Sequence, residues 1–133
     1  EPLAFLLEDA SIQEVISPYY MGRIVDFVSF IEKYPFIPSV LDREWKFKLI
    51  DPIMECNQGY FYLTISREGH GQVMRIMEKC EDTIDIQTMT TMLMSYKRPE
   101  DLAKIGRIQA AEWTIDMLED AIEQQTPYIS DYF

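Results

Sequence analysis

Two runs of alternating residues near the middle of the chain limit the fold more than any other feature. In residues 44–49, and again in residues 60–65, every second side chain is large and apolar. Successive side chains of a β-strand point to opposite faces, so each run predicts a half-buried strand with one apolar face. The residues on these apolar faces are Trp45, Phe47, Leu49, Phe61, Leu63 and Ile65.

Turn signals connect these runs into a sheet. Gly69-His70-Gly71 separates residues 60–67 from residues 72–77, which predicts a hairpin. Thr83–Asp85 predicts a last short strand, and the first quarter of the chain is also strand-like before its first helix.

Capping residues and helical spacing predict four helices. Asp26 is a good N-cap for the first helix, and Asp85 is placed to cap the second. Pro99, with acidic residues after it, predicts the start of a third helix that ends at Gly106. A fourth is predicted over about 110–124. The predicted inward residues are Phe27, Phe30, Ile31, Tyr34, Met89, Met92, Leu93, Tyr96, Leu102, Ile105, Ile115, Leu118 and Ile122.

The order of elements predicts an α+β fold, with strands first and helices after them. We expect an antiparallel sheet of about five strands with helices packed on one face. The 133 residues suit one domain, 1–133, with a core of its own.

The charge balance narrows the range of partners. With 12 basic and 23 acidic residues the net charge is −11, which disfavours nucleic acid and anionic membranes because both need a basic surface. Cys56 and Cys80 are too few for a disulfide framework and badly spaced for a structural metal, so we expect reduced thiols, no metal and a cytoplasmic protein. No apolar run approaches the roughly 20 residues that span a bilayer.

The chain carries little chemistry of its own. Its single histidine, His70, lies between two glycines and is interpreted as an exposed turn residue rather than a base. Tyr96-Lys97-Arg98 is interpreted as a solvated turn, and the acid pairs Glu81-Asp82 and Glu119-Asp120 as surface residues. No phosphate-binding loop or metal-ligand spacing is present in the sequence.

The last eight residues, Thr126–Phe133, are unusual for a chain end because they include three aromatic residues and an isoleucine. Pro127 stops the preceding helix and favours an extended arm. Such an arm either plugs the core of its own domain or delivers the α-carboxylate of Phe133 into a site. The residues alone favour the first reading, since buried apolar residues are usually packing.

Several segments together resemble the last domain of bacterial GNAT-type N-acetyltransferases of the enhanced-intracellular-survival type, a domain that is similar to sterol carrier proteins. The resemblance covers nearly the whole chain in the right order. The segments that carry it are Met21–Asp26, Tyr34–Phe36, Asp85–Met94, Tyr96–Pro99, Thr126–Tyr128 and Asp131–Phe133.

The resemblance implies that the chain is the C-terminal domain of a longer enzyme, and the absence of an initiator Met before Glu1 agrees with a fragment. Acetyl-CoA would bind to upstream acetyltransferase domains of the same polypeptide, not to this fragment, which alone would be inactive. In the family the terminal α-carboxylate acts as general base toward an amine substrate, which makes Phe133 the candidate catalytic residue. The general acid, a tyrosine, would lie upstream. The family's tendency toward larger assemblies leaves a homo-oligomer open.

One departure from the family bears on the substrate. The best-known branch has an acidic residue just before the terminal aromatic residue, whereas this chain has Tyr132 there and Asp131 one step earlier. Tyr132 and Asp131 are therefore the candidate substrate-binding residues, and an aminoglycoside-like polyamine is a doubtful substrate. The alternative function is a stand-alone sterol-carrier-like module that binds a lipid or other apolar ligand near Met89, Met92 and Met94, although plain core packing is the stronger interpretation of these methionines.

Overall fold

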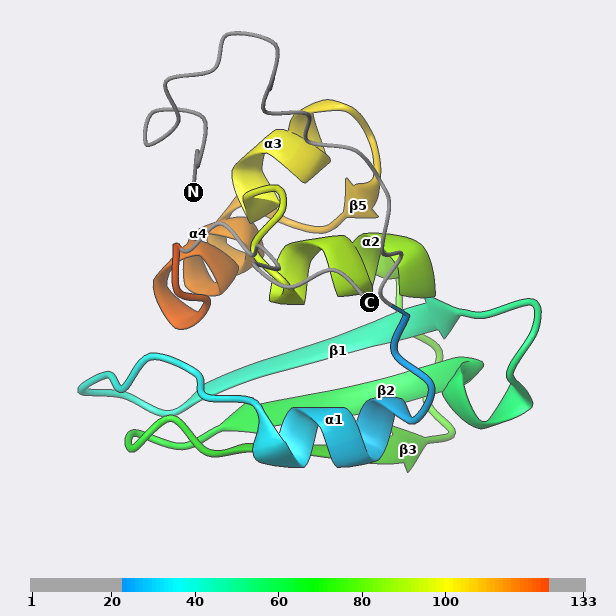
Figure 1. Ribbon diagram of the computed structural model, residues 1–133, viewed down its shortest axis with the longest axis horizontal. Helices are drawn as coiled ribbons and strands as arrows, with labels where there is room; N and C mark the ends of the chain where they lie inside the picture. The colour runs from blue at the N-terminus through cyan, green and yellow to red at the C-terminus, as the bar shows by residue number, and fades with distance from the viewer. Residues whose placement is uncertain (1–22, 125–133) are drawn as a thin grey trace, which may run out of the picture.

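The sheet has five strands, and the computed structural model describes residues 23–124 of the chain. The strands are β1 (Arg43–Ile50), β2 (Gly59–Ile65), β3 (Gly71–Ile76), β4 (Thr83–Asp85) and β5 (Ile108–Gln109). They lie in the order β3-β2-β1-β4-β5. Figure 1 shows β1, β2 and β3 side by side. The predicted α+β class and the number of strands are confirmed, while the strand-like start predicted before residue 23 lies outside the described residues.

The direction of one strand differs from the prediction. β1, β2 and β3 form an antiparallel meander in which Phe47 lies opposite Phe61. β4, however, pairs with β1 in parallel, with Leu49 opposite Ile84, and β5 returns antiparallel to β4. The prediction of a purely antiparallel sheet is therefore wrong. The loop at 77–82 carries the chain from the end of β3 past β1, so β4 enters in the same direction as β3 and β1.

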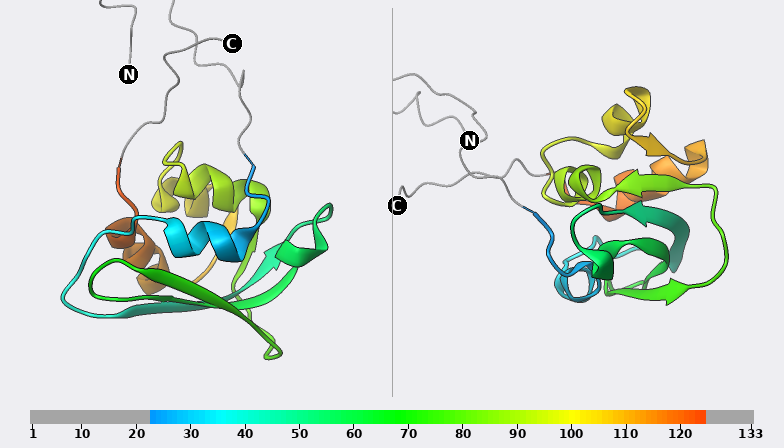
Figure 2. Two further views of the ribbon diagram at one scale, coloured as in Figure 1. Left: turned by 60° about the horizontal axis from the view of Figure 1, so that its bottom comes forward. Right: turned by 90° about the vertical axis from the view of Figure 1, so that its right-hand side faces the viewer.

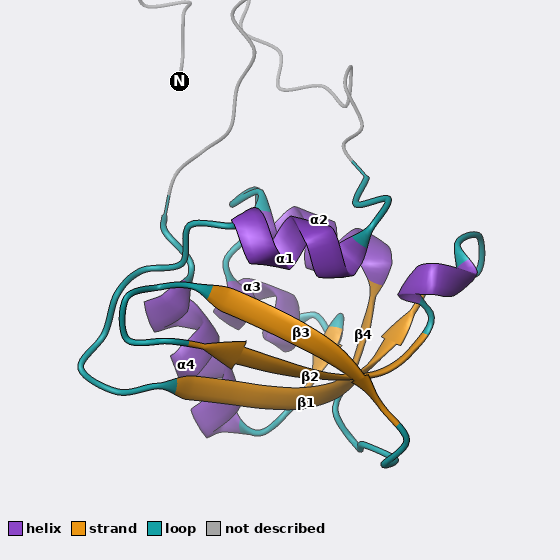
Figure 3. Cartoon of the chain, turned by 90° about the horizontal axis from the view of Figure 1, so that it is seen from below, coloured by secondary structure: helices purple, strands orange, loops and turns teal. Residues whose placement is uncertain are grey.

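Four α-helices and one 3-10 turn complete the described chain. They are α1 (Phe27–Lys33), η2 (Glu55–Asn57), α2 (Ile86–Leu93), α3 (Pro99–Lys104) and α4 (Glu112–Ala121). α1 and α2 lie on the same side of the sheet (Figures 2 and 3). α1 packs against β3, α2 against β4, and α3 against both α4 and β5.

The predicted helix starts are confirmed by their caps. The Asp26 carboxylate accepts a hydrogen bond from the Ser29 backbone N–H at 3.2 Å, and the Asp85 carboxylate accepts one from the Thr88 N–H at 2.7 Å. Each bond satisfies an N–H that the helix leaves without a partner. Pro99 occupies the first turn of α3, ahead of two acidic residues.

The core lies between the helices and one face of the sheet. All six apolar residues of the two alternating runs are buried. The ring of Phe27, on α1, meets the rings of Phe47 and Phe61 edge-on, with centroids 5.9 and 5.5 Å apart. Aromatic rings favour this arrangement. Ile115 and Leu118 bring α4 into the same cluster, so the predicted inward faces of the sheet and of these helices meet.

Two residues predicted to lie on inner helix faces are exposed instead. Tyr96 is 50% exposed and Ile105 is 70% exposed. Each lies just beyond its helix, because α2 ends at Leu93 and α3 ends at Lys104, so helical spacing no longer determines which way they face. The two-residue strand β5 was not predicted, since two residues are too few to show an alternating pattern.

The predicted turn between β2 and β3 is confirmed. Gly69 has a φ of +92°, and a Cβ added there would lie 2.2 Å from the carbonyl oxygen of Phe36. Glycine is the residue that tolerates both the left-handed backbone and this close approach. The turn therefore packs directly against the loop that follows α1.

Candidate functional site

The three predicted site residues, Asp131, Tyr132 and Phe133, lie outside the described residues. The described chain ends at Gln124, just after α4. Three features of the described part bear on function. They are the polar contacts around the end of α4, a hollow on the outer face of the sheet, and a buried carboxylate near the start of α1.

Arg98 and Glu119 form a half-buried ion pair beside the end of α4. Nη2 and Nε of Arg98 lie 2.7 and 2.9 Å from Oε1 of Glu119, and the two side chains are 19% and 26% exposed. Oε2 of Glu119 also accepts a hydrogen bond from the Glu100 N–H at 2.8 Å, which fixes the carboxylate against α3. The interpretation of Arg98 as a solvated turn residue, and of Glu119 as a plain surface residue, is wrong. The two residues are 21 positions apart, so no local pattern could have paired them.

Tyr34 reaches the same region from the end of α1. Its hydroxyl donates a hydrogen bond to the Leu93 carbonyl oxygen at the end of α2. Burial raises the pKa of Tyr34 to about 12, so the phenol stays protonated and can keep donating at neutral pH. The Phe36 ring packs against the Tyr34 ring with centroids 4.6 Å apart. Tyr34 therefore ties α1 to the end of α2.

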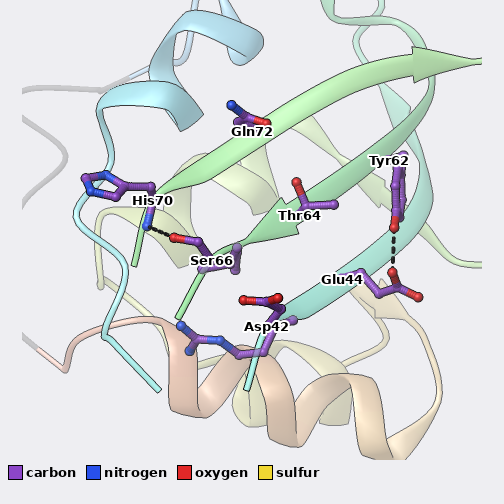
Figure 4. A pocket seen from close by; sticks show the side chains of 9 residues that line it. Asp42, Glu44, Tyr62, Thr64, Ser66, His70 and Gln72 are labelled. Carbon is purple, nitrogen blue, oxygen red and sulfur yellow. Dashed lines mark hydrogen bonds between the residues drawn. The ribbon is translucent and has the colours of Figure 1, made fainter. Parts of the chain in front are cut away.

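A hollow of about 450 Å³ lies on the outer face of the sheet (Figure 4). The Glu44 carboxylate accepts a hydrogen bond from the Tyr62 hydroxyl, and this bond raises the pKa of Tyr62. The residues that line the hollow are Asp42, Arg43, Glu44, Tyr62, Thr64, Ile65, Ser66, His70 and Gln72. Carboxylates, hydroxyls and an amide can hold a polar group, and carboxylates can hold an amine.

His70 lies at the edge of this hollow, and its side chain is exposed. Its backbone N–H, rather than its imidazole, donates to the Ser66 hydroxyl at 3.1 Å. The interpretation of His70 as an exposed turn residue is confirmed.

Asp51 is a buried carboxylate that holds the start of the described chain. It accepts hydrogen bonds from Arg23 Nη2 at 2.6 and 2.5 Å and from Asn57 Nδ2 at 2.9 Å. It also accepts the backbone N–H groups of Ile53 and Met54, each at 3.0 Å. Burial alone would raise the pKa of Asp51, but these hydrogen bonds outweigh it and hold the pKa well below its usual range.

Asn57 extends this contact into α1. Its Oδ1 accepts the N–H of Phe27 at 2.9 Å, and its Nδ2 also donates to the carbonyl oxygen of Ile24 at 3.2 Å. Arg23 lies in Met21–Asp26, one of the segments that carry the family resemblance. Its ion pair with Asp51 could not be predicted from the sequence, because the two residues are 28 positions apart.

Within residues 23–124, no three His, Cys, Asp or Glu side chains form a group that could hold a metal ion. Cys56 and Cys80 are both free thiols. Over the same residues, no helix has the length and apolar character needed to cross a membrane.

Comparison with known proteins identifies relatives of this fold. A family model described as a sterol carrier protein domain matches residues 27–130. A search of curated proteins found no significant match.

Three solved structures have a similar fold over most of this chain. A probable N-acyltransferase of unknown function from Enterococcus faecalis is 29% identical, with a TM-score of 0.77, and the match covers 84% of this chain and 28% of that one. A GCN5-related N-acetyltransferase from Anabaena variabilis is 24% identical, with a TM-score of 0.73 over 84% of this chain and 28% of that one. Eis1 from Mycobacterium abscessus is 13% identical, with a TM-score of 0.67 over 84% and 27%.

The two less similar structures share the fold alone with this chain. In all three cases the chain spans less than a third of the length of the solved protein.

Proposed function

Because this chain belongs to the sterol carrier protein domain family, we propose that it is the C-terminal domain of a GNAT-type N-acetyltransferase. The observation that carries the proposal is the match to a probable N-acyltransferase, at 29% identity and a TM-score of 0.77, over 28% of that protein. The remaining length of such a protein has room for separate acetyltransferase domains. In this proposal those domains bind acetyl-CoA, and the present domain supplies the terminal carboxylate and part of the substrate wall.

In the proposed reaction, the nitrogen of the amine substrate attacks the thioester carbonyl carbon of acetyl-CoA. The C–N bond forms and the C–S bond breaks, so coenzyme A leaves as a thiolate that takes a proton from an acid on the upstream domains. The α-carboxylate of Phe133 takes the proton that the attacking nitrogen loses. The Phe133 carboxylate thus acts as a general base, and general acid–base catalysis typically raises the rate by about 10²- to 10⁴-fold.

A free carboxyl terminus is a weak base in water, with a pKa of about 3.3–3.7. Enclosure among aromatic side chains disfavours the charged form and moves the pKa toward neutrality. The tail supplies Tyr128, Tyr132 and Phe133 for such an enclosure, and the upstream domains would complete it. Tyr132 and Asp131 are the proposed contacts to the amine.

The test is to append one glycine after Phe133 in the full-length polypeptide. The glycine moves the carboxylate by one residue while leaving every side chain in place. We expect kcat to fall by about 10²-fold or more, with acetyl-CoA affinity measured by calorimetry unchanged. A matched variant, Phe133→Tyr, keeps a terminal carboxylate on an aromatic residue and should retain most of the turnover. Undiminished turnover in the extended enzyme would refute the assignment of the base.

The family match is also compatible with the alternative, an apolar-ligand carrier. Met89 and Met92, the two central methionines of that hypothesis, are each 1% exposed and belong to the continuous core. Met94 is 38% exposed and lies just after α2. These contacts support packing as the role of Met89 and Met92.

A further inference from the structure

The carbonyl groups at the end of α4 accept hydrogen bonds from two other segments of the chain, the loop after α1 and the loop between α2 and α3. The last carbonyls of a helix have no partner within the helix. Here the Ala121 carbonyl accepts the Ile37 N–H at 2.9 Å, from the loop after α1. The Ile122 carbonyl accepts Nη1 of Arg98 at 3.0 Å, and the Glu123 carbonyl accepts the Ser95 hydroxyl at 2.7 Å. Three successive peptide groups are therefore fixed where the chain leaves the helix.

Two of these bonds lie beyond the helix itself. α4 ends at Ala121, and Ile122 already has an extended backbone, with φ −106° and ψ 122°. A bond to the carbonyl of Ile122 or Glu123 therefore does not lengthen the helix. It sets the direction in which the following residues leave the domain.

Arg98 is rigidly placed for this contact. Besides the Ile122 carbonyl, its Nη2 donates to the Glu119 carbonyl at 2.9 Å, and its guanidinium is paired with the Glu119 carboxylate. That carboxylate is itself fixed by the Glu100 N–H. The planar guanidinium can make all these bonds at once, which a lysine ammonium on a flexible stem cannot reproduce.

Ser95 occupies its position despite an unfavourable backbone. Its φ is +63°, and it is the one residue besides glycines with a positive φ in the part of the chain that the structure describes. Glycine or asparagine is the usual choice in the left-handed region. The serine hydroxyl, however, makes the bond to the Glu123 carbonyl, which glycine could not make. Strained positions of this kind often mark sites where a side chain is needed for function.

The chain runs on for ten residues beyond Glu123, to Phe133. At about 3.3–3.6 Å per extended residue, the terminal carboxylate can lie anywhere within roughly 35 Å of Glu123 if the exit is free to turn. Fixing the exit direction reduces that volume, and placing a catalytic group in advance reduces the entropy lost in reaching the reactive geometry.

We propose that Arg98 and Ser95 are positioning residues that hold the base of the C-terminal arm and so direct the Phe133 carboxylate toward the acetyltransferase site. This inference rests on the proposed function. Neither residue touches the substrate, and both act through the backbone at Ile122 and Glu123.

The test uses Arg98→Lys and Ser95→Gly in the full-length polypeptide, with Lys104→Gln as a control because Lys104 is a surface cation on α3, 69% exposed. Acetyl-CoA turnover is followed with spermidine and lysine as acceptor amines. We expect both variants to lower kcat by about 10- to 100-fold, with the KM for acetyl-CoA unchanged. Hydrogen exchange measured by mass spectrometry should be faster in peptides that cover residues 122–126, and the control should behave as the parent enzyme.

Ser95→Gly separates positioning from stability. Glycine relieves the left-handed backbone, so Tm should not fall, although kcat should. Loss of activity that only follows a fall in Tm would overturn the positioning role, as would unchanged exchange in residues 122–126. If the enzyme extended after Phe133 loses turnover while Arg98→Lys and Ser95→Gly keep it, the positioning proposal fails and the proposed function stands. If the extended enzyme keeps its turnover, the proposed function itself fails, whatever the two variants show.

Discussion

Replacing Asp51 by asparagine tests whether the buried carboxylate holds the start of α1 to the rest of the domain. The substitution keeps the shape of the side chain and removes its charge. One oxygen can still accept the backbone N–H groups of Ile53 and Met54. The new NH₂ group, however, cannot accept a hydrogen bond. The Asn57 Nδ2 hydrogen directed at Asp51 therefore loses its acceptor, and Arg23 Nη2 keeps only its contact with the other oxygen.

The size of the effect follows from these contacts. A buried donor left without its acceptor costs about 1–3 kcal/mol, and this applies to Asn57, which is 1% exposed. The Arg23 side chain is 31% exposed, so water can replace part of its ion pair, and its loss adds less than the breaking of a fully buried pair. Together these give a loss in free energy of unfolding of about 2–4 kcal/mol at pH 7.

The pH dependence is a second signature of the same carboxylate. An aspartate in the unfolded chain has a pKa of about 3.9, and the folded pKa of Asp51 lies well below its usual range. The folded state therefore binds the proton less readily, so the stabilisation is present above the unfolded pKa and is lost as the pH falls through the folded pKa. The difference between the parent and Asp51→Asn should be constant from pH 5 to 8 and should shrink below about pH 4.

Urea unfolding followed by fluorescence of the buried Trp45 measures both effects. Asp116→Asn is the matched control, because it removes an exposed carboxylate from α4 and should change stability by less than about 0.5 kcal/mol. A loss in Asp51→Asn no larger than that of the control, or a loss that stays the same down to pH 2.5, would refute the reasoning.

Two further substitutions test the core and a helix cap, each by urea unfolding. Phe47→Ala removes a fully buried ring that contacts Phe27 and Phe61, and it should lower the free energy of unfolding by about 3–5 kcal/mol. The control Met77→Ala changes a side chain that is 95% exposed and should lower it by less than about 0.5 kcal/mol. Equal effects of the two substitutions would contradict the packing of Phe47 in the core. Asp85→Ala removes the cap of α2 and should lower the free energy of unfolding by about 1 kcal/mol. Asp85→Asn keeps an oxygen that can cap the helix, so it should lose little stability. An equal loss in both variants would show that the charge of Asp85, not its capping hydrogen bond, stabilises the helix.

Much of the fold could be predicted from the sequence because the signals are local. Alternation assigned Trp45 and Phe61 to the buried face, and short-range caps placed the starts of α1 and α2 at Asp26 and Asp85. The candidate site was different. The sequence selected the C-terminal arm through its composition and a family resemblance, and its residues 131–133 lie outside the described part of the chain. Arg98 was interpreted as solvated because nothing within a few residues reveals its partner.

The sequence by itself therefore determined which side chains face inward and where the helices begin. Those properties depend on residues within a few positions of one another, whose relative directions are set by the periods of strand and helix. The tertiary structure alone decided that β4 runs parallel to β1, and it alone brought together the pairs Arg23–Asp51 and Arg98–Glu119. A strand shows the same alternation whichever way it pairs, and a side chain many positions away becomes a partner only when the whole chain has folded.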